Sequence, residues 1–269
     1  MQQRHLNREQ YFNELAQTAR EHYIGYISRF QPITPTTKVL EVGCGEGGNL
    51  LPFAEMGCRV TGIERFPERV EQAQAYFQKK GYSGRFIAND FLKYKPQTNE
   101  KYDLVLIHDV IEHIPDKDSF LEHLKGFVHK DSLIFWGFPA WQMPFGGHQQ
   151  ICRSRLYSHL PFIHLLPVPV YRYLLKANKE TTGCINELLD IRKSRITTER
   201  FEQLAETHGL SIVDRCLWLV NPHYQQKFHL KPRKLPAALS RIRYIRNFLS
   251  TSCFYLTRTA GEATEIFSH

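Results

Sequence analysis

The sequence predicts an α/β fold built on a doubly wound, mostly parallel sheet. Along residues 36–140, short apolar runs alternate with segments of helical periodicity, as in proteins whose parallel strands are joined by helices. The first apolar run, residues 38–42, ends in a turn that is rich in glycine, and the second, residues 59–63, ends in the acidic residue Glu64. A glycine-rich turn followed about 20 residues later by an acid is typical of a nucleotide-binding half-sheet.

The remaining elements follow from the same patterns. Residues 8–30 carry apolar side chains at helical spacing, and Pro32 and Pro35 end this first helix. Strands are expected near residues 38–42, 59–63, 84–88, 102–108, 131–138, 210–220 and 251–258. The helices that alternate with them are expected near residues 47–57, 66–80, 117–128 and 197–208.

Length and composition fit one domain of this kind. The chain has 269 residues, of which 42% are hydrophobic, so it can bury a substantial core. Its six cysteines include no closely spaced pair, which is typical of reduced cytosolic thiols and indicates no metal ribbon. The polar N-terminus does not resemble a signal peptide, and no apolar run reaches the roughly 18 residues of a membrane span. We therefore expect a cytoplasmic protein, either soluble or peripheral at a membrane.

The charges around the glycine turn indicate what kind of ligand it binds. Gly43, Gly45 and Gly47 carry no side chain, so their backbone can approach a ligand closely. Glu41 and Glu46 flank this turn, and two carboxylates would repel the pyrophosphate of a dinucleotide. A cationic nucleoside fits better, because the same carboxylates attract it. S-adenosylmethionine, which carries a sulfonium and an ammonium beside its adenosine, is such a ligand.

Four motifs, in order, resemble those of the class I S-adenosylmethionine-dependent methyltransferases. They are Glu41-x-Gly43-x-Gly45-x-Gly47, Glu64, residues 86–91 and residues 102–114. The resemblance is close over residues 36–140 and looser over residues 195–258, and it implies a Rossmann-like seven-stranded sheet whose last strand is antiparallel. It also implies that Glu64 binds the ribose and that Asp90 takes the adenine amino group. The residues expected to bind the cofactor are Glu41, Gly43, Cys44, Gly45, Gly47, Glu64, Arg65, Asn89, Asp90, Phe91 and His108.

Methyl transfer to oxygen needs the acceptor to be placed in line with the sulfonium methyl and its proton to be removed. The proton can pass to a general base, most often histidine, or a cation can lower the pKa of the hydroxyl. His148 follows two glycines just beyond the fifth predicted strand, in a loop that can reach the methyl group. We expect His148 to be the catalytic base. The alternative is a surface histidine bonded to backbone.

A second cluster of polar residues follows the fourth predicted strand. Asp109, Glu112 and His113 share one face if a helix begins there, so two carboxylates and an imidazole could meet one cation. The pattern resembles the metal-binding Glu-x-x-Glu-His of ubiquinone-biosynthesis O-methyltransferases and small-RNA ribose methyltransferases, with Asp in its first position. The resemblance implies a divalent cation such as Mg²⁺, with His148 as a further ligand instead of a base. The alternative is that Glu112 and His113 only cap and pack the helix.

Four segments complete the expected organisation. They are a helical lid over residues 1–35, a core of residues 36–140 and 195–261, an inserted substrate cap over residues 141–194, and a basic insertion over residues 222–250 between the last two strands. From Arg215 to Arg258 the chain has nine Lys and Arg residues and no Asp or Glu. The apolar residues of 235–249 fall on one helical face, so we expect a basic amphipathic helix. Residues 227–249 would then meet an anionic membrane surface or a phosphate-bearing partner, unless the helix simply packs on the sheet.

These features favour S-adenosylmethionine-dependent methyl transfer to an oxygen of a small-molecule, lipid-linked or saccharide acceptor. An RNA ribose methyltransferase that grips phosphates with its basic C-terminal stretch is the second hypothesis. Its weakness is that the cap is apolar and that no added RNA-binding fold can be identified. A cofactor-binding regulator without catalysis is the third hypothesis, which holds only if no base or acceptor pocket faces the methyl group.

Overall fold

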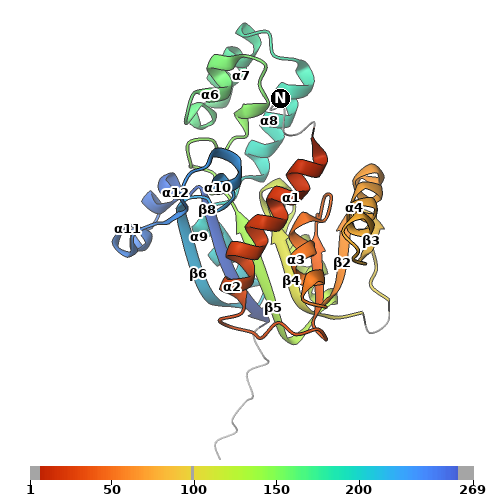
Figure 1. The fold of residues 1–269 in the computed structure, drawn as a ribbon. Helices are drawn as coiled ribbons and strands as arrows, with labels where there is room; N and C mark the ends of the chain where they lie inside the picture. Colours follow the sequence, from red (N-terminus) through yellow and green to blue (C-terminus); the bar gives the residue numbers. More distant parts are fainter. Residues whose placement is uncertain (1–6, 98–99, 260–269) are drawn as a thin grey trace, which may run out of the picture.

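The centre of the molecule is one mixed sheet. The computed structural model describes residues 7–97 and 100–259. Within these residues eight strands lie in the order β3-β2-β1-β4-β5-β8-β6-β7 (Figure 1). The strands are β1 (Lys38–Val42), β2 (Arg59–Glu64), β3 (Arg85–Ala88), β4 (Tyr102–His108), β5 (Val128–Phe138), β6 (Leu210–Val220), β7 (Arg233–Lys234) and β8 (Ser252–Thr259). β1 to β5 are parallel and β8 is antiparallel to β5 and β6, which confirms the doubly wound fold.

The sheet has one more strand than the seven expected. β7 lies at the edge, where it pairs with Trp218 and Val220 of β6. Two residues are too few to give a strand pattern in the sequence, so β7 was not predicted. β5 also begins earlier than residue 131, because Val128 pairs with Tyr102 before the register shifts.

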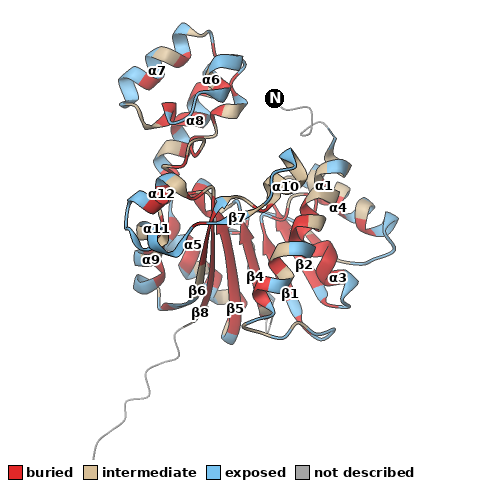
Figure 2. Ribbon diagram, turned by 60° about the vertical axis from the view of Figure 1, so that its left-hand side comes forward, coloured by how far each residue is buried: buried red, intermediate tan, exposed pale blue. Residues whose placement is uncertain are grey.

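Helices cover both faces of the sheet and define two cores. One core lies under α1 (Arg8–Thr18), α3 (Leu51–Glu55) and α4 (Pro67–Lys79), and the other under α5 (Lys117–Leu124) and α9 (Thr198–Thr207) (Figure 2). Side chains of β4 alternate between them: Leu104 and Leu106 join the first core, and Val105 and Ile107 join the second. Figure 2 shows the resulting buried strands. Because β1 to β4 are parallel, their carboxyl ends form one edge, where open sheets of this type bind ligands.

A continuous helical segment leads into the sheet. α1 is followed by the π-helix η2 (Ala19–Tyr23) and by α2 (Ile24–Ile27), so the helix expected over residues 8–30 extends to Ile27. The Asn7 side chain caps α1 by accepting from the Gln10 amide. Phe12 of α1 packs so closely that a Cβ on Gly48 would lie 2.6 Å from its carbonyl oxygen. α1 therefore lies against the glycine turn, and its role as a lid stays a prediction.

Residues 141–194 form a helical segment beyond the carboxyl edge of the sheet (Figures 1 and 2). It contains α6 (Arg155–His159), α7 (Val168–Ala177), α8 (Thr182–Ser194) and the 3-10 helices η6 (Gln149–Ile151) and η7 (Ile163–Leu165). It has a small core of its own, formed by Cys152, Ile163, Tyr171, Leu175, Ile185, Leu188 and Leu189. We call this segment the cap; that it binds a substrate stays a prediction.

The single amphipathic helix expected over residues 235–249 is wrong. The segment forms two short helices, α11 (Ala237–Arg241) and α12 (Ile245–Leu249), and Tyr244 between them has a φ of +65°. Helical periodicity in the sequence does not reveal this break, because the intervening residues include no glycine or proline. No helix in the described part of the chain combines the length and the apolarity needed to span a bilayer.

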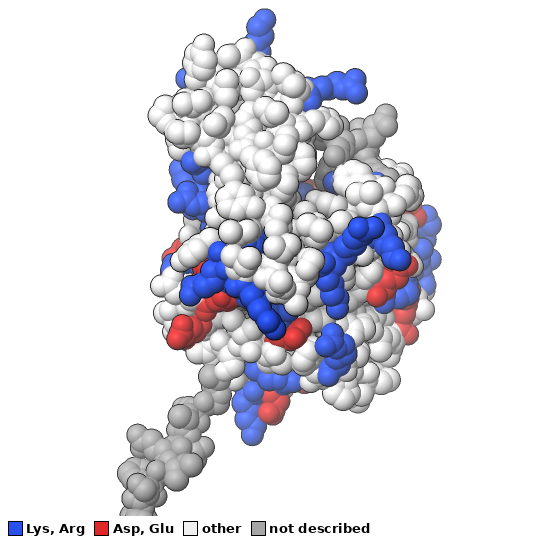
Figure 3. All heavy atoms as spheres, turned by 90° about the vertical axis from the view of Figure 1, so that its left-hand side faces the viewer, with Lys and Arg blue, Asp and Glu red and all other residues white. Residues whose placement is uncertain are grey.

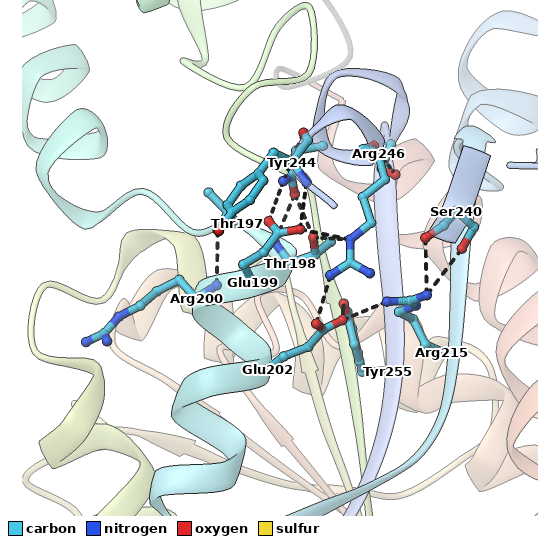
Figure 4. Close-up of polar contacts among 12 residues, drawn as sticks. Thr197, Thr198, Glu199, Arg200, Glu202, Arg215, Ser240, Tyr244, Arg246 and Tyr255 are labelled. Atoms are coloured by element: carbon cyan, nitrogen blue, oxygen red, sulfur yellow. Dashed lines mark hydrogen bonds and ion pairs between the residues drawn. The ribbon is translucent and has the colours of Figure 1, made fainter. Parts of the chain in front are cut away.

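Part of the basic stretch is neutralised inside the molecule (Figure 4). Arg246 is buried, and its guanidinium binds the carboxylates of Glu199 and Glu202 at 3.0 and 2.8 Å. Arg215 binds Glu202 at 2.8 Å, and the Tyr255 hydroxyl donates to the same carboxylate at 2.9 Å. These contacts fasten α12 and β6 to α9, so two of the nine cations serve the fold instead of a surface.

Candidate functional site

The glycine turn lies at the carboxyl end of β1. Gly47 adopts the left-handed conformation, with a φ of +79°, and begins the 3-10 helix η3 (Gly48–Leu50). A Cβ at Gly47 would lie 2.8 Å from the Phe86 ring, so both the conformation and the space require glycine. The amides of Gly43 and Cys44 donate to the Ile63 carbonyl oxygen at 2.8 and 3.2 Å. The turn is thereby held against the end of β2.

Glu64 joins this turn to the two neighbouring strands. Its Oε2 accepts from the Gly45 amide and its Oε1 from the Phe66 amide, both at 3.1 Å. The Asn89 amide donates to the Glu64 carbonyl oxygen at 2.9 Å. The carboxylate is buried and fixed, and its remaining lone pairs can accept from the hydroxyls of a ligand.

The other expected cofactor residues lie near the ends of β2 and β3. Asp90 is exposed, and its carboxylate accepts from the Leu92 amide at 3.0 Å. The Phe91 ring is buried in the second core, so its side chain packs and only its backbone is offered to a ligand. The guanidinium of Arg65 lies over the Phe66 ring at 4.5 Å. That these residues bind a cofactor stays a prediction, but the fold brings them to one edge.

The two acids that flank the turn differ in their surroundings. Glu41 is buried, and only the Asn49 side chain donates to it, at 2.7 Å, among the described residues. Burial raises the pKa of Glu41 to about 8, against the effect of this hydrogen bond, and the nearby Glu64 adds to the rise. Glu46 instead forms an ion pair with Arg8 of α1 at 3.1 Å. Because Arg8 already pairs with Glu46, the attraction for a cation that we expected from both acids depends on Glu41 in its ionised form.

A chain of polar contacts that the sequence did not reveal runs from the buried Tyr23 to the partly exposed Asp109 beside this edge. The Tyr23 hydroxyl of η2 lies 2.8 Å from His108 Nε2, and His108 Nδ1 lies 3.3 Å from Asp109 Oδ2. Loss of water would raise the pKa of Asp109, but the His108 imidazole lowers it to about 2. A Cβ on Gly137 would lie 2.3 Å from the His108 ring, so glycine in β5 makes room for this histidine. Asp109 therefore presents an ionised carboxylate at the end of β4.

Aromatic residues from opposite ends of the chain lie close enough to Asp109 to feel its charge. The Tyr11 ring of α1 meets the His223 ring of α10 (His223–Phe228) edge to face at 5.9 Å. Burial first, and then the charge of Asp109, raises the pKa of Tyr224 to about 12 and that of Tyr11 further still. α1 and α10 therefore pack together beside Asp109. No sequence pattern links them, because they lie at opposite ends of the chain.

The metal cluster expected after β4 has different members from those predicted. Asp109 has a φ of +54°, residues Ile111–His113 form a single 3-10 turn η4, and α5 begins only at Lys117. The helix that was to place Asp109, Glu112 and His113 on one face is therefore wrong. The structure instead groups Glu112, His113 and His148, whose ligand atoms lie within 4.8 Å of one another.

Glu112 is the one acid of this group, and its carboxylate is buried. It is 4% exposed, and neither carboxylate oxygen has a hydrogen-bond partner in the described structure. Burial raises its pKa well above the ordinary value, and the charge of Asp109 raises it further. The His113 Nε2 atom lies 3.9 Å from Glu112 Oε1. An unpartnered buried carboxylate beside two imidazoles fits a bound cation, which would supply the missing charge.

Two residues that the sequence did not single out hold Glu112 in place. The Ser194 hydroxyl, at the end of α8, donates to the Glu112 carbonyl oxygen at 2.6 Å. The buried ammonium of Lys117 donates to the carbonyl oxygens of Ile114 and Ser194. Burial lowers the pKa of Lys117 to about 8, partly offset by Glu112. The cap helix α8 is thus fastened directly to the segment that carries Glu112.

His148 sits in a tightly packed loop at the start of the cap. It has a φ of +56°, and a Cβ on the preceding Gly147 would lie 2.2 Å from the His164 side chain. The His148 and His113 rings meet edge to face at 5.0 Å. Burial, and then the neighbouring His113, lowers the pKa of His148 to about 4. The imidazole is therefore neutral near neutral pH and able to bind a cation, but a pKa this low makes it a weak base.

Comparison with known sequences identifies related domains. Residues 33–157 match the family model described as a methyltransferase domain. The chain is similar to the ubiquinone biosynthesis O-methyltransferase of Methylobacterium sp. (strain 4-46), with 31% identity over 112 residues, or 39% of this chain and 41% of the relative. It is also similar to the "Probable (S)-tetrahydroprotoberberine N-methyltransferase 2" of Papaver bracteatum, with 32% identity over 113 residues, or 41% of this chain and 31% of that protein. The chain spans less than half the length of these curated relatives.

Solved structures share the fold over most of the chain. An S-adenosylmethionine-dependent methyltransferase of Clostridium acetobutylicum ATCC 824 has a TM-score of 0.55 and 11% identity, covering 91% of this chain and 92% of that chain. The magnesium protoporphyrin IX methyltransferase of Synechocystis PCC 6803, solved with bound SAH, has a TM-score of 0.53 and 15% identity, covering 92% of this chain and 84% of that chain. Identities this low show a common fold and nothing finer.

Proposed function

We propose that the chain, whose residues 33–157 match a methyltransferase domain, is a class I S-adenosylmethionine-dependent methyltransferase that transfers the methyl group of this cofactor to an oxygen of a small-molecule, lipid-linked or saccharide acceptor. The observation that carries the proposal is the proximity, at one edge of the sheet, of two kinds of residue. The glycine turn with Glu64 suits an adenosine, and the group of Glu112, His113 and His148 suits an acceptor hydroxyl.

In the proposed complex the chain places the cofactor through groups that are already fixed. Glu64 accepts from the ribose hydroxyls, and Asp90 with the Phe91 amide meets the adenine. Glu41 and the ionised Asp109 attract the sulfonium and ammonium groups. The Tyr23–His108 contact holds the Asp109 carboxylate in one orientation. Most of the rate enhancement then comes from holding the acceptor in line with the methyl group.

The choice of an oxygen acceptor rests on Glu112, His113 and His148. These residues would hold a divalent cation, which when bound lowers the pKa of an acceptor hydroxyl. Two imidazoles and one carboxylate suit a transition metal better than Mg²⁺, which prefers oxygen ligands. His148 acting as the base is the competing role, and its low pKa argues against it.

The first test is cofactor binding, measured by calorimetry. S-adenosylmethionine should bind, and NAD should not compete with it. Glu64→Ala should weaken binding by about 2–3 kcal/mol, or roughly 30- to 150-fold, because ribose hydroxyls lose a charged acceptor. Glu68→Ala, an exposed acid in the first turn of α4, is the control. Tighter binding of NAD than of S-adenosylmethionine would refute the proposal.

We also propose that the cap meets an anionic membrane surface, which would suit a lipid-linked acceptor. Large apolar side chains are exposed on the cap, including Leu156 at 68% and Tyr173 at 70%. This exposed apolar surface extends from the cap to the C-terminal segment, because the ring of Phe162 in the cap lies 6.4 Å from the ring of Phe248 in α12. Figure 3 shows this uncharged face with Lys and Arg at its margin. Apolar surface bordered by cations is typical of a membrane-binding surface.

Vesicle sedimentation tests this surface. The protein should bind vesicles that contain phosphatidylglycerol more strongly than vesicles of phosphatidylcholine, and salt should weaken the binding. Replacing two exposed cap residues, Leu156→Asp and Val170→Asp, should abolish it. Tyr82→Asp, at an exposed aromatic residue outside the cap, should leave it unchanged. Equal binding by the cap variant and the wild type would rule out the cap as the docking surface.

A further inference from the structure

A second group of metal-binding side chains lies inside the cap, and it shares no residue with the candidate functional site. Ligand atoms of Cys152, Glu180 and Cys184 lie within 4.8 Å of one another. Cys152 directly follows η6, Glu180 lies between α7 and α8, and Cys184 is in the first turn of α8. Cys152 and Glu180 are buried and Cys184 is partly exposed. The two cysteines are far apart in the sequence, so only the fold brings them together.

The Glu180 carboxylate is held in place but is not neutralised. The backbone amides of Arg153 and Ser154 donate to its two oxygens, each at 3.0 Å. In the described part of the chain, no Lys, Arg or His side chain forms an ion pair with it. A buried carboxylate without a counter-ion is costly, and a cation at this position would remove that cost. The two amides leave lone pairs on both oxygens for such a cation.

Tyr171 of α7 supplies a second, independent sign of a ligand. Its side chain is fully buried, and its hydroxyl has no hydrogen-bond partner in the described structure. Tyr171 belongs to the same buried cluster as Cys152, and Cys184 packs against that cluster, so the hydroxyl lies in the part of the cap that holds both thiols. Buried hydroxyls almost always have a partner. An ion bound between the thiols, or a water held by that ion, would provide one.

We propose that Cys152, Glu180 and Cys184 bind one Zn²⁺ ion, with the Tyr171 hydroxyl facing its fourth position. Two thiolates and a carboxylate form a ligand set that Zn²⁺ accepts, whereas Mg²⁺ and Ca²⁺ prefer oxygen ligands alone. Binding releases the two thiol protons to solvent and forms two Zn–S bonds. The ion joins the loop after η6 to the start of α8 and so stabilises the core of the cap. This site is independent of the proposed methyl transfer.

The test is a cobalt titration of the full chain under a non-coordinating reductant. Co²⁺ bound by two thiolates gives a thiolate-to-cobalt charge-transfer absorption, which the imidazoles and carboxylate of the other group cannot give. We expect this absorption to saturate at one thiolate-bound cobalt per chain, whatever further cobalt the Glu112, His113 and His148 group binds, and to be lost when Zn²⁺ is added. Cys184→Ser should weaken Zn²⁺ binding by more than about 100-fold, and Tyr171→Phe by about tenfold. Cys216→Ser, a buried cysteine of β6, is the matched control.

Glu180→Gln provides a second variant should Cys184→Ser fail to fold, because it keeps both thiols and an oxygen that accepts from one of the two backbone amides. It should also weaken Zn²⁺ binding, and the melting temperature of the wild type should rise with Zn²⁺ while that of the variant does not. A wild-type protein with free thiols and no charge-transfer absorption would overturn the proposal. So would an absorption that persists unchanged in Cys184→Ser. Either result leaves S-adenosylmethionine binding, measured separately, unaffected.

Discussion

The carboxyl edge of β1–β3 and the junction of β4 with the cap are built in different ways. At the edge, the contacts join consecutive strand ends, as when Glu64 accepts from the Gly45 amide in the preceding turn. At the junction, Glu112, His148 and Ser194 come from three separate segments. A cofactor site of the first kind is set by local backbone conformation, whereas an acceptor site of the second kind depends on how the cap packs. Variants in the two regions should therefore separate cofactor binding from turnover.

The largest expected effect is at His148. His148→Ala should lower kcat for methyl transfer by about 10²- to 10⁴-fold, because the acceptor hydroxyl loses a proton acceptor or a cation ligand. The dissociation constant of S-adenosylmethionine, measured by calorimetry, should change by less than about twofold. His159→Ala, an exposed histidine of α6, is the control. A variant that loses cofactor binding instead would show that the two regions are not separate.

Glu112→Gln sharpens this comparison by separating the two roles of His148. If a cation is held there, Glu112→Gln and a chelator should each reduce turnover as strongly as His148→Ala does. Retained activity in both cases would leave His148 as a base acting alone. Adding Mg²⁺, Mn²⁺, Co²⁺ or Zn²⁺ back to the chelated protein identifies which cation restores turnover.

The next largest effect concerns cofactor binding at the carboxyl edge of β1–β3, and it depends on pH. The pKa of Glu41 is raised to about 8, so this carboxyl is mostly protonated at neutral pH in the free protein. A cationic ligand favours the ionised form, so binding should tighten as pH rises toward about 8, by at most about tenfold per pH unit. Calorimetry across this range should show the trend in the wild type and not in Glu41→Gln. The ammonium group of the ligand also titrates with pH. Glu41→Gln controls for this, because the variant keeps the titration of the ligand and removes that of residue 41.

Glu41 also affects the stability of the ligand-free protein. Because its folded-state pKa is raised, it stabilises the fold most below its ordinary pKa of 4.5, and this contribution is lost as pH rises through about 8. The free energy of unfolding of the wild type should therefore fall across this range relative to that of Glu41→Gln. Parallel stability curves for the two proteins would contradict the assignment of the raised pKa to Glu41.

The smallest expected effect is at the link between the cap and Glu112. Ser194→Ala removes the hydroxyl that donates to the Glu112 carbonyl oxygen, and it should cost about 1 kcal/mol of stability in denaturant unfolding. Turnover should fall severalfold because Glu112 is less firmly placed, while cofactor affinity stays unchanged. Ser158→Ala, whose hydroxyl bonds a carbonyl oxygen within α6, serves as the control. A change in cofactor affinity would mean that the link reaches the glycine turn.

The sequence predictions were more accurate for the strands of the sheet than for the junction of β4 with the cap. The strands at residues 38–42, 59–63 and 102–108 were predicted to within about one residue, because strands buried on both faces of a parallel sheet appear in the sequence as short, nearly continuous apolar runs. The helix face expected for Asp109, Glu112 and His113 was wrong, because the positive φ of Asp109 is set by its contact with His108 and by β5. The prediction of a single helix over residues 235–249 was wrong for a similar reason, because contacts from outside the segment hold it. Arg246 binds the acids of α9.

By itself, the sequence determined seven of the strands and the helices between them in the core, the glycine turn and the position of Glu64. Each depends on a few neighbouring residues whose conformation and polarity are local properties. Only the tertiary structure decided that Glu112, His113 and His148 meet, that Tyr23 reaches His108, and that Cys152 and Cys184 flank Glu180. These groups join side chains from distant segments, and their positions depend on the packing of the cap and the N-terminal helices on the sheet. No local pattern encodes that packing.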